Sequence, residues 1–329
     1  MQGCRGESFY ILEFENFWLI AVIEGLGTRG KVADAMYQAY GGDPYHAMGW
    51  SAFATIANDF ATSGANPAAS LMYLGAGSNE WFRNADKVKA FGRGWADGCR
   101  DVHCTLGGGE MPMLRDVIMP ETFEILGAAF GIMPKPQRPI MSGGVQAEDS
   151  IVVIASSGVH DNGYTLCRDL VSFGLLPNGY STCVEPGLSY GQALLKPTTL
   201  YGPLVKACAA KGVEVHSWVN ITGHGWAKLA RADQPLHYMV HTLPPVPPIF
   251  RFIQERGSVS LENMYHTFNM GGGFAAFAPP RWVGEIRAAA KALGFESWDV
   301  GSVFIADDGM KKVVLPNGVQ FTDKDAAIR

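Results

Sequence analysis

Residues 151–165 of the chain read Ile-Val-Val-Ile-Ala-Ser-Ser-Gly-Val-His-Asp-Asn-Gly-Tyr-Thr. The apolar run Ile151–Ala155 predicts a buried strand that ends at Ser156, and helical spacing of apolar residues begins at Leu166. A Ser- and Gly-rich turn between a strand and a helix directs backbone N–H groups and hydroxyls toward one point. Such a turn is typical of an anion site, most often for phosphate. The alternative is a plain connection whose serines only cap the helix.

Three further glycine-rich segments favour the phosphate-binding interpretation. They are Glu24–Lys31, Gly107–Pro112 and Asn220–Gly225. The chain holds 40 glycines, and they gather in these segments. Because glycine has no side chain, its backbone can approach another molecule closely. We therefore expect a protein that brings its backbone close to its ligands.

Length and composition indicate a globular protein of two domains. The chain has 329 residues, of which 47% are hydrophobic and 17% are charged. The net charge is −5 and the basic residues are scattered, which argues against nucleic acid or an anionic membrane as a partner. The proline- and glycine-rich stretch Met133–Gly144 is the best candidate boundary, because its prolines disfavour both helix and central strand. We predict domains over residues 1–135 and 146–329.

The cysteines and the apolar segments indicate a cytoplasmic protein. The six cysteines include no Cys-x-x-Cys pair, so we expect reduced and mostly buried thiols. The apolar stretch Phe17–Ile23 is too short to span a bilayer, and Glu13 and Glu15 precede it where a signal peptide carries Lys or Arg. We interpret this stretch as a core strand.

Apolar periodicity and the positions of Gly and Pro predict the order of the elements. In the first half we expect strands at 8–14, 18–23, 68–74, 105–106 and 122–133, helices at 32–40, 47–62 and 84–99, and a loop at 107–112. In the second half we expect strands at 151–155, 237–241 and 273–278 and helices at 165–173, 203–210, 223–230, 249–256, 260–268 and 281–293. Residues 311–329 are expected to add one strand and a frayed end.

Seven motifs, in the same order along the chain, resemble those of the aminoimidazole ribonucleotide synthetases, the PurM family of purine biosynthesis. They are Glu24–Lys31, Ala57–Asp59 with Ser63–Pro67, Gly108–Pro112, Ala155–Tyr164, Leu194–Tyr201, Ile221–Gly223 and Phe268–Gly271. One such motif is weak evidence, whereas seven in order indicate the fold family.

The resemblance implies a two-domain α/β (α+β) fold. The N-terminal strands would form a barrel across a homodimer, beside a C-terminal α+β domain. It also implies an ATP-dependent ligase that converts formylglycinamidine ribonucleotide to aminoimidazole ribonucleotide. In that reaction ATP phosphorylates an amide oxygen, the substrate's amidine nitrogen closes the imidazole ring, and phosphate departs. Such chemistry depends on placing the γ-phosphate and neutralising its charge with Mg²⁺ and basic side chains.

The resemblance also assigns roles to individual residues. ATP would be bound by Gly27, Thr28, Arg29, Lys31, Asn58 and Asp59. The ribose phosphate or the transferred phosphate would be bound by Ser156, Ser157, Gly158, His160, Asn162, Gly163, Thr222, Gly223 and Asn269. Mg²⁺ would be held by Asp59, Glu110 and Glu24, and catalysis would involve Glu110, His160 and Asp59.

Each role has a simpler alternative. A carboxylate can be a surface group or a helix cap, Lys31 can be a solvated helix start, and a loop histidine such as His160 can bond to the backbone. We expect Asp59, near a helix end, to be removable at little structural cost. We also expect the Ser156–Gly163 turn to lie near the Thr222–Gly225 turn and to face Glu110.

Three positions depart from the family pattern. Ser51 and Met72 stand where the family has carboxylates, and Asn220 stands where it has a histidine. Met72 cannot hold Mg²⁺, because that cation prefers oxygen ligands. Two alternatives to the cyclo-ligase therefore stay open: a related ATP-dependent enzyme for another amide or acid, and a catalytically weakened paralogue that only binds nucleotide.

Overall fold

The N-terminal half forms a five-stranded sheet. The structure is a computed structural model and describes residues 4, 6–322 and 325. The strand order is β1-β2-β5-β3-β4; β3 and β4 are parallel, and the other neighbours are antiparallel. The strands are β1 Tyr10–Glu13, β2 Phe17–Gly25, β3 Ala69–Ala76, β4 Thr105–Glu110 and β5 Phe123–Pro134.

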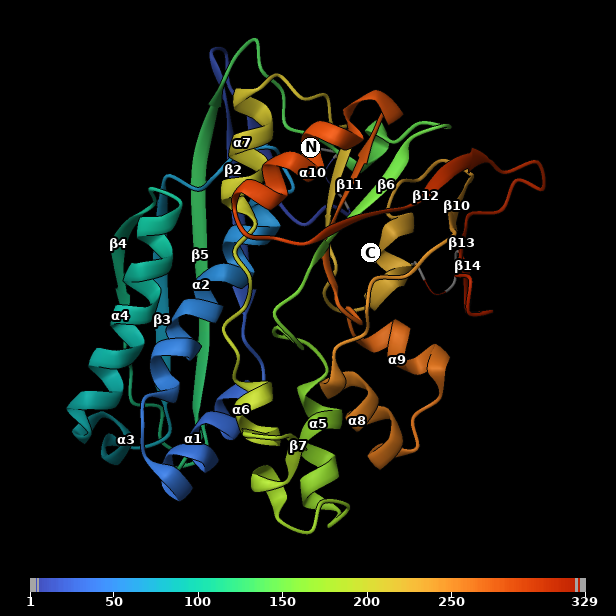
Figure 1. Cartoon of the computed structure of the whole chain (residues 1–329). Coiled ribbons are helices and arrows are strands. Elements are labelled where there is room, and N and C mark those ends of the chain that lie inside the picture. The colour runs from blue at the N-terminus through green and yellow to red at the C-terminus, as the bar shows by residue number, and fades with distance from the viewer. Residues whose placement is uncertain (1–3, 5, 323–324, 326–329) are drawn as a thin grey trace.

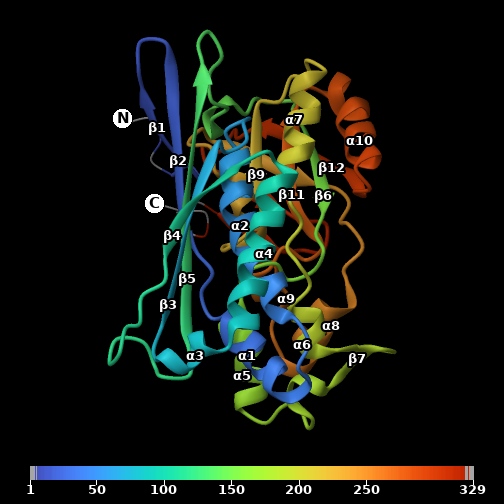
Figure 2. The ribbon, with the colours of Figure 1, turned by 90° about the vertical axis from the view of Figure 1, so that its left-hand side faces the viewer.

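Helices of the described chain cover one face of this sheet and leave the other uncovered (Figure 2). They are α1 Arg29–Tyr40, α2 Pro44–Ala61, α3 Asn79–Arg83 and α4 Ala85–Asp101. Side chains of β5 largely alternate between buried and less buried positions, as expected for a strand with one covered face. Because α2 lies between the sheet and the C-terminal half, it is buried along most of its length (Figure 2).

The helices α2 and α4 cross at close range, because each has a glycine at the crossing. A methyl group on Gly49 would lie 1.9 Å from the carbonyl oxygen of Phe91. A methyl group on Gly94 would lie 1.9 Å from the carbonyl oxygen of His46. Only a residue without a Cβ fits at either position.

The C-terminal half forms a seven-stranded sheet of order β14-β13-β10-β12-β6-β11-β9 (Figure 1). Its strands are β6 Ser150–Ala155, β9 Ser217–Asn220, β10 Leu236–Val240, β11 Gly272–Ala278, β12 Ser297–Ile305, β13 Lys312–Val314 and β14 Gln320–Thr322. A small separate sheet contains β7 Cys183–Glu185 and β8 Leu188–Ser189. The helices are α5 Tyr164–Ser172, α6 Tyr190–Leu194, α7 Gly202–Ala210, α8 Pro248–Gly257, α9 Leu261–Thr267 and α10 Val283–Ala292, together with the 3₁₀ turn η4 Gly225–Ala230.

The strand β6 is buried on both faces. Ile151 and Val153 belong to the large core that extends through both halves of the molecule. Val152 and Ile154 belong to a second core, which is completed by apolar side chains of α7 and α10. This double burial explains the unbroken apolar run of the sequence. After Ala155 the chain passes through the Ser156–Gly163 turn into α5.

The predicted two-domain α/β fold is confirmed, and three predictions of local structure are wrong. Residues 107–110 belong to β4 rather than to a loop. Residues 223–230 contain a 3₁₀ turn instead of a full helix. The C-terminal segment adds two strands, β13 and β14, and most of the expected frayed end lies outside the described residues. A barrel across a dimer stays a prediction. In the part of the chain that the structure describes, no helix is both long and apolar enough to cross a membrane.

We expect Gly94→Ala to lower the free energy of unfolding by about 3 kcal/mol, because the added methyl group would force α2 and α4 apart. Urea denaturation measures this loss. Gly92→Ala is the matched control in the same helix, since its methyl group would meet no heavy atom of the described structure within 4 Å. The control should leave stability unchanged or raise it by up to about 1 kcal/mol. Equal losses in the two variants would contradict the close crossing.

Candidate functional site

A buried ion pair joins the two halves of the molecule. Arg29, at the start of α1, contacts Asp161 in the turn after β6, and the two side chains are only 0% and 4% exposed. The guanidinium also donates to the carbonyl oxygen of Lys196 at 2.7 Å and to Oγ1 of Thr198 at 3.2 Å. The Asp161 carboxylate accepts from Thr198 at 2.5 Å and from Thr55 of α2 at 2.7 Å. These partners compensate both charges for their loss of water.

This environment differs from the ATP-binding role predicted for Arg29. The terminal nitrogens bind protein groups from the other domain, and the side chain has no exposed surface. Its Nε is buried without a hydrogen-bond partner among the described residues. In this arrangement Arg29 fixes the two domains relative to each other and presents no charge to solvent.

Two polar side chains of α2 hold the segment that follows α6. The Asn58 amide donates to the carbonyl oxygen of Thr199 and accepts from the N–H of Tyr201, both at 2.8 Å. Oγ of Ser51 accepts from the N–H of Thr198 at 3.1 Å. Asn58, predicted to bind ATP, therefore uses its amide group to hold this segment. Ser51, one of the departures from the family pattern, likewise has a defined partner inside the protein.

The Ser156–Gly163 turn is held in place by Asn269. The side chain of Asn269 accepts from Oγ of Ser156 at 2.8 Å and donates to the carbonyl oxygen of Gly158 at 2.9 Å. Gly158 has a φ of 152° and Gly163 a φ of 78°, conformations that favour glycine. The turn therefore has one well-defined shape.

A second glycine-containing turn lies against this loop. A methyl group on Gly223 would lie 3.3 Å from Oδ1 of Asn162. The hydroxyl of the preceding Thr222 accepts from the ammonium group of Lys228. The structure thus brings together the Ser156–Gly163 turn, Thr222, Gly223 and Asn269. That they bind a phosphate stays a prediction.

His160 is buried inside the turn. Its Nε2 accepts from the backbone N–H of Ser157 at 3.2 Å and of Thr199 at 3.4 Å. Burial lowers the pKa of His160 to about 4, although the nearby Asp161 carboxylate opposes the shift, so the ring is neutral at pH 7. A neutral, buried ring that orients two N–H groups acts as a positioning residue. This geometry favours the simpler alternative over the predicted catalytic role.

Glu24 of β2 and Asp59 of α2 are neighbours at the domain junction. Burial, together with the charge of Asp59, raises the pKa of Glu24 to about 7. Oδ1 of Asp59 accepts from Nδ2 of Asn220 in β9 at 2.7 Å. The charges of Lys228 and Arg231 act on both carboxylates. Asp59 is 5% exposed, so the expectation that it could be removed at little structural cost is wrong.

Glu110 lies apart from these two carboxylates. It ends β4 at the edge of the N-terminal sheet, and the strands β5 and β3 separate β4 from β2, which carries Glu24. Within residues 4, 6–322 and 325, no group of three or more His, Cys, Asp or Glu side chains is arranged to hold a metal ion. Among the described residues, the three carboxylates predicted to bind Mg²⁺ do not form such a group. That the Ser156–Gly163 turn faces Glu110 stays a prediction.

A small cavity lies at the start of α1. Gly27, Thr28 and Lys31 line it together with residues 117–119 and 122–124, and its volume is about 230 Å³. The N-terminus of a helix and a lysine amine both favour an anion. Three of the residues predicted to bind ATP therefore share one small cavity.

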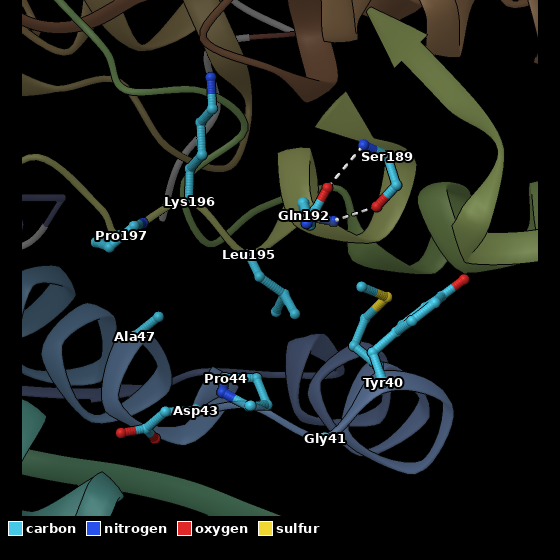
Figure 3. Close-up of a pocket in the computed structure, with 12 residues that line it drawn as sticks. Tyr40, Gly41, Asp43, Pro44, Ala47, Ser189, Gln192, Leu195, Lys196 and Pro197 are labelled. Carbon is cyan, nitrogen blue, oxygen red and sulfur yellow. Dashed lines mark hydrogen bonds between the residues drawn. The ribbon is translucent and has the colours of Figure 1, made fainter. Parts of the chain in front are cut away.

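A larger cavity of about 600 Å³ lies between the domains (Figure 3). Its lining residues come from the α1–α2 corner and from the α6 region: Met36, Tyr40, Gly41, Gly42, Asp43, Pro44, Ala47, Ser189, Gln192, Leu195, Lys196 and Pro197. Ser157 Oγ donates to the carbonyl oxygen of Pro197 at 2.6 Å, so the cavity borders the Ser156–Gly163 turn. Its volume lies in the range of small-molecule sites.

Sequence reasoning missed four residues of this junction: Asp161, Thr198, Lys228 and Arg231. Asp161 lies between His160 and Asn162, both of which are predicted to bind phosphate, and a carboxylate beside an expected anion site needs a cationic partner. Lys228 interrupts the apolar run Trp226–Ala230. A lone charge in such a run indicates a buried partner, which is a signal the sequence did offer.

Two family models match the chain. They describe the AIR synthase related protein, N-terminal domain, over residues 7–133, and the AIR synthase related protein, C-terminal domain, over residues 146–311. The phosphoribosylformylglycinamidine cyclo-ligase of Lachnospira eligens is 30% identical over 305 residues, which cover 91% of this chain and 85% of that protein. The protein of the same name from Carboxydothermus hydrogenoformans is 32% identical over 302 residues, which cover 90% and 83%.

Solved structures share the fold. Thiamine-monophosphate kinase from Stenotrophomonas maltophilia gives a TM-score of 0.63 at 18% identity, over 90% of this chain and 89% of its own. AaThiL complexed with AMPPCP and TMP gives a TM-score of 0.60 at 17% identity, over 96% and 91%. At these identities the likeness shows the fold alone.

We expect Asp161→Ala to lower the free energy of unfolding by about 3–5 kcal/mol, because it leaves the buried Arg29 guanidinium without its counter-charge. Chemical denaturation of the whole chain measures the change. Asp97→Ala is the control, since it breaks ion pairs with His46 and Arg100 in which every side chain is at least 37% exposed. The control should leave the midpoint unchanged. A small effect of Asp161→Ala would mean that the ion pair does not hold the junction together.

Proposed function

Because this chain belongs to the AIR synthase related protein family, we propose that it is a phosphoribosylformylglycinamidine cyclo-ligase. The observation that carries the proposal is its similarity to relatives of that name, at 30% identity over 91% of the chain. The matched regions include both domains. The likeness therefore extends across the junction where the candidate residues meet.

The proposed reaction consumes ATP to make a leaving group. The γ-phosphoryl group moves to the amide oxygen of formylglycinamidine ribonucleotide, and ADP departs. The amidine nitrogen attacks the same carbon, the bond from carbon to the phosphorylated oxygen breaks, and loss of a proton completes the imidazole ring. The products are aminoimidazole ribonucleotide, ADP and phosphate. Because the substrate supplies its own nucleophile, the protein contributes mainly by positioning and by charge stabilisation.

The substrate phosphate is proposed to bind at the Ser156–Gly163 turn. This turn starts α5, a helix of nine residues, and Thr222 and Gly223 lie against it. The buried His160 supports this role by holding the shape of the turn, because its Nε2 accepts from the N–H groups of Ser157 and Thr199. The neighbouring cavity of about 600 Å³ is large enough to take the body of a ribonucleotide.

ATP is proposed to place a phosphate at the start of α1, in the cavity lined by Gly27, Thr28 and Lys31. The complex of AaThiL with AMPPCP supports nucleotide use in this fold. Mg²⁺ would neutralise charge on the nucleotide phosphates. Among the carboxylates predicted to hold it, the exposed Glu110 retains that proposed role, whereas Glu24 and Asp59 are buried near each other at the domain junction.

The decisive measurement is ADP release by the purified chain with ATP, Mg²⁺ and formylglycinamidine ribonucleotide. We expect release that requires the ribonucleotide. We also expect Gly158→Ala to raise the KM for the ribonucleotide at least tenfold, because its Cβ would enter the proposed phosphate site. Gly174→Ala is the matched control: Gly174 also has a positive φ, 69°, but it follows α5. Both variants place alanine at a positive φ, and Gly158→Ala is the more strained of the two, so thermal unfolding of both variants is measured beside the kinetics. Equal KM values would contradict phosphate binding at the turn.

A second candidate is a paralogue that binds nucleotide without turnover. Two observations favour it. Ser51 replaces an expected carboxylate and accepts from the N–H of Thr198, and the Glu24 and Asp59 carboxylates raise the pKa of the buried Lys228 against the effect of its burial. Calorimetry separates the two candidates. Tight ATP binding without ribonucleotide-dependent ADP release would favour the paralogue.

A homodimer is proposed to form through the uncovered face of the N-terminal sheet. Apolar side chains lie exposed on this sheet, among them Tyr10, Ile23, Leu71, Phe130 and Ile132. The strand register places Ile132 opposite Leu19 and Phe130 opposite Ala21, so the apolar positions form one continuous patch. A patch of this kind marks an interaction surface.

We expect Ile132→Glu to convert the dimer to a monomer, because two copies would bury facing carboxylates at the proposed interface. Sedimentation equilibrium measures the change in mass. Phe173→Glu is the control: Phe173 is more exposed than Ile132, at 73% against 60%, but it follows α5 in the other domain. A wild-type chain that sediments as a monomer would overturn the proposal.

A further inference from the structure

The side chain of Lys196 lies at the border between the Ser156–Gly163 turn and the cavity of about 600 Å³ between the domains. A methyl group on Gly158 would lie 4.0 Å from Cδ of Lys196, so the lysine stem runs beside that glycine. Lys196 also lines the cavity, where Figure 3 shows its side chain extended. The lysine therefore adjoins both places that are proposed for one ligand, the turn for its phosphate and the cavity for its body.

The backbone that carries Lys196 is held by hydrogen bonds. Its carbonyl oxygen accepts from the Arg29 guanidinium at 2.7 Å, and the carbonyl oxygen of Pro197 accepts from Oγ of Ser157 at 2.6 Å. The N–H of Thr198 donates to a hydroxyl of α2 at 3.1 Å. The Lys196 side chain is exposed, and within the described residues its ammonium group has no hydrogen-bond or ion-pair partner. The base of this side chain is thus fixed while its charge stays available.

The turn itself offers a phosphate no free positive charge. The negative charge of Asp161 is balanced by the buried Arg29. Burial lowers the pKa of His160 to about 4, so its ring is neutral at pH 7. Lys228 is 6% exposed, and its ammonium group donates to the hydroxyl of Thr222. Because a phosphate monoester carries about 1.5 to 2 negative charges at pH 7, its binding here requires a further cation.

We propose that Lys196 supplies this cation: its ammonium group binds the phosphate of a sugar phosphate at the Ser156–Gly163 turn, while the sugar occupies the adjoining cavity. The inference rests on the proposed function for the place of the phosphate, and it adds the residue that neutralises the phosphate charge. A hydrogen bond from an ammonium group to a phosphate oxygen is about twice as strong as one between neutral groups. Lys196 thereby contributes to affinity for the ligand and takes no part in the chemical step.

Calorimetric titration with ribose 5-phosphate, in the absence of nucleotide, tests the inference. We expect the wild-type chain to bind this probe. Lys196→Met keeps an apolar stem and removes the charge, so it should bind the probe about tenfold more weakly. Lys196→Arg restores the charge and should keep the affinity within about threefold of the wild type. Added salt should weaken binding to the wild type more than binding to Lys196→Met.

Lys206→Met is the matched control, because it removes an exposed lysine of α7 and should bind the probe like the wild type. Since both lysines are exposed, neither substitution to methionine should change the Tm, which thermal unfolding measures. Equal affinity of the wild type and Lys196→Met for ribose 5-phosphate would overturn the inference. A wild-type chain that does not bind the probe would also overturn it.

The proposed function and this inference fail in different ways. Binding of the probe that depends on Lys196, in a chain without ribonucleotide-dependent ADP release, would contradict the cyclo-ligase reaction and leave the inference standing. An active chain in which Lys196→Met leaves the KM for the ribonucleotide unchanged would contradict the inference alone.

Discussion

The buried pair of Arg29 and Asp161 is the constraint on which the relative position of the two domains depends. A guanidinium without exposed surface must find its counter-charge and acceptors inside the protein, and here all of them come from the C-terminal half. Asp161 belongs to the Ser156–Gly163 turn, so this turn is tied to the start of α1. The first glycine-rich segment and the proposed phosphate turn are thus held together by one charge. Such a pair adds little net stability compared with apolar packing, but it specifies a single geometry.

Local sequence patterns predict those helices and strands in which burial alone determines where apolar and polar side chains stand. The apolar run of β6 and the apolar faces of α2 and α4 are examples, because burial alone determines their composition. Most of the strand β4 is not predicted, because Gly107–Gly109 has the composition of a loop. Gly109 is required by packing rather than by a turn, because a methyl group at this position would lie 1.9 Å from the carbonyl oxygen of Met72 on the neighbouring strand β3. The sequence patterns also do not predict β12. Asp299, Gly301 and Ser302 interrupt its apolar pattern, and its register with β6 shifts between Asp299 and Gly301.

In the candidate site, likewise, local motifs are predictable and long-range contacts are not. Motifs within a few residues identify the two glycine turns and Asn269, and the structure brings these together. The polar partners of the buried charged side chains cannot be found in this way. Arg29 and Asp161 are 132 positions apart in the sequence, and Asn220 and Asp59 are 161 apart. No local pattern encodes a pairing over such distances. For this reason local motifs predict ATP binding by Arg29 and Asn58, whereas in the structure both side chains are buried and hydrogen-bonded to distant segments.

The cost of burying a charge also explains two departures from the family pattern, Ser51 and Asn220. Ser51 and Asn220 each place a neutral polar group where the pattern has an ionisable one, and each is hydrogen-bonded across the domain junction. A carboxylate at position 51 would lie against Thr198, and the hydroxyl of Thr198 already donates to the Asp161 carboxylate. A histidine at position 220, if charged, would add a positive charge where Lys228 and Arg231 already act on the Asp59 carboxylate. Neutral hydrogen-bonding groups at both positions preserve the polar contacts without adding a buried charge to the junction.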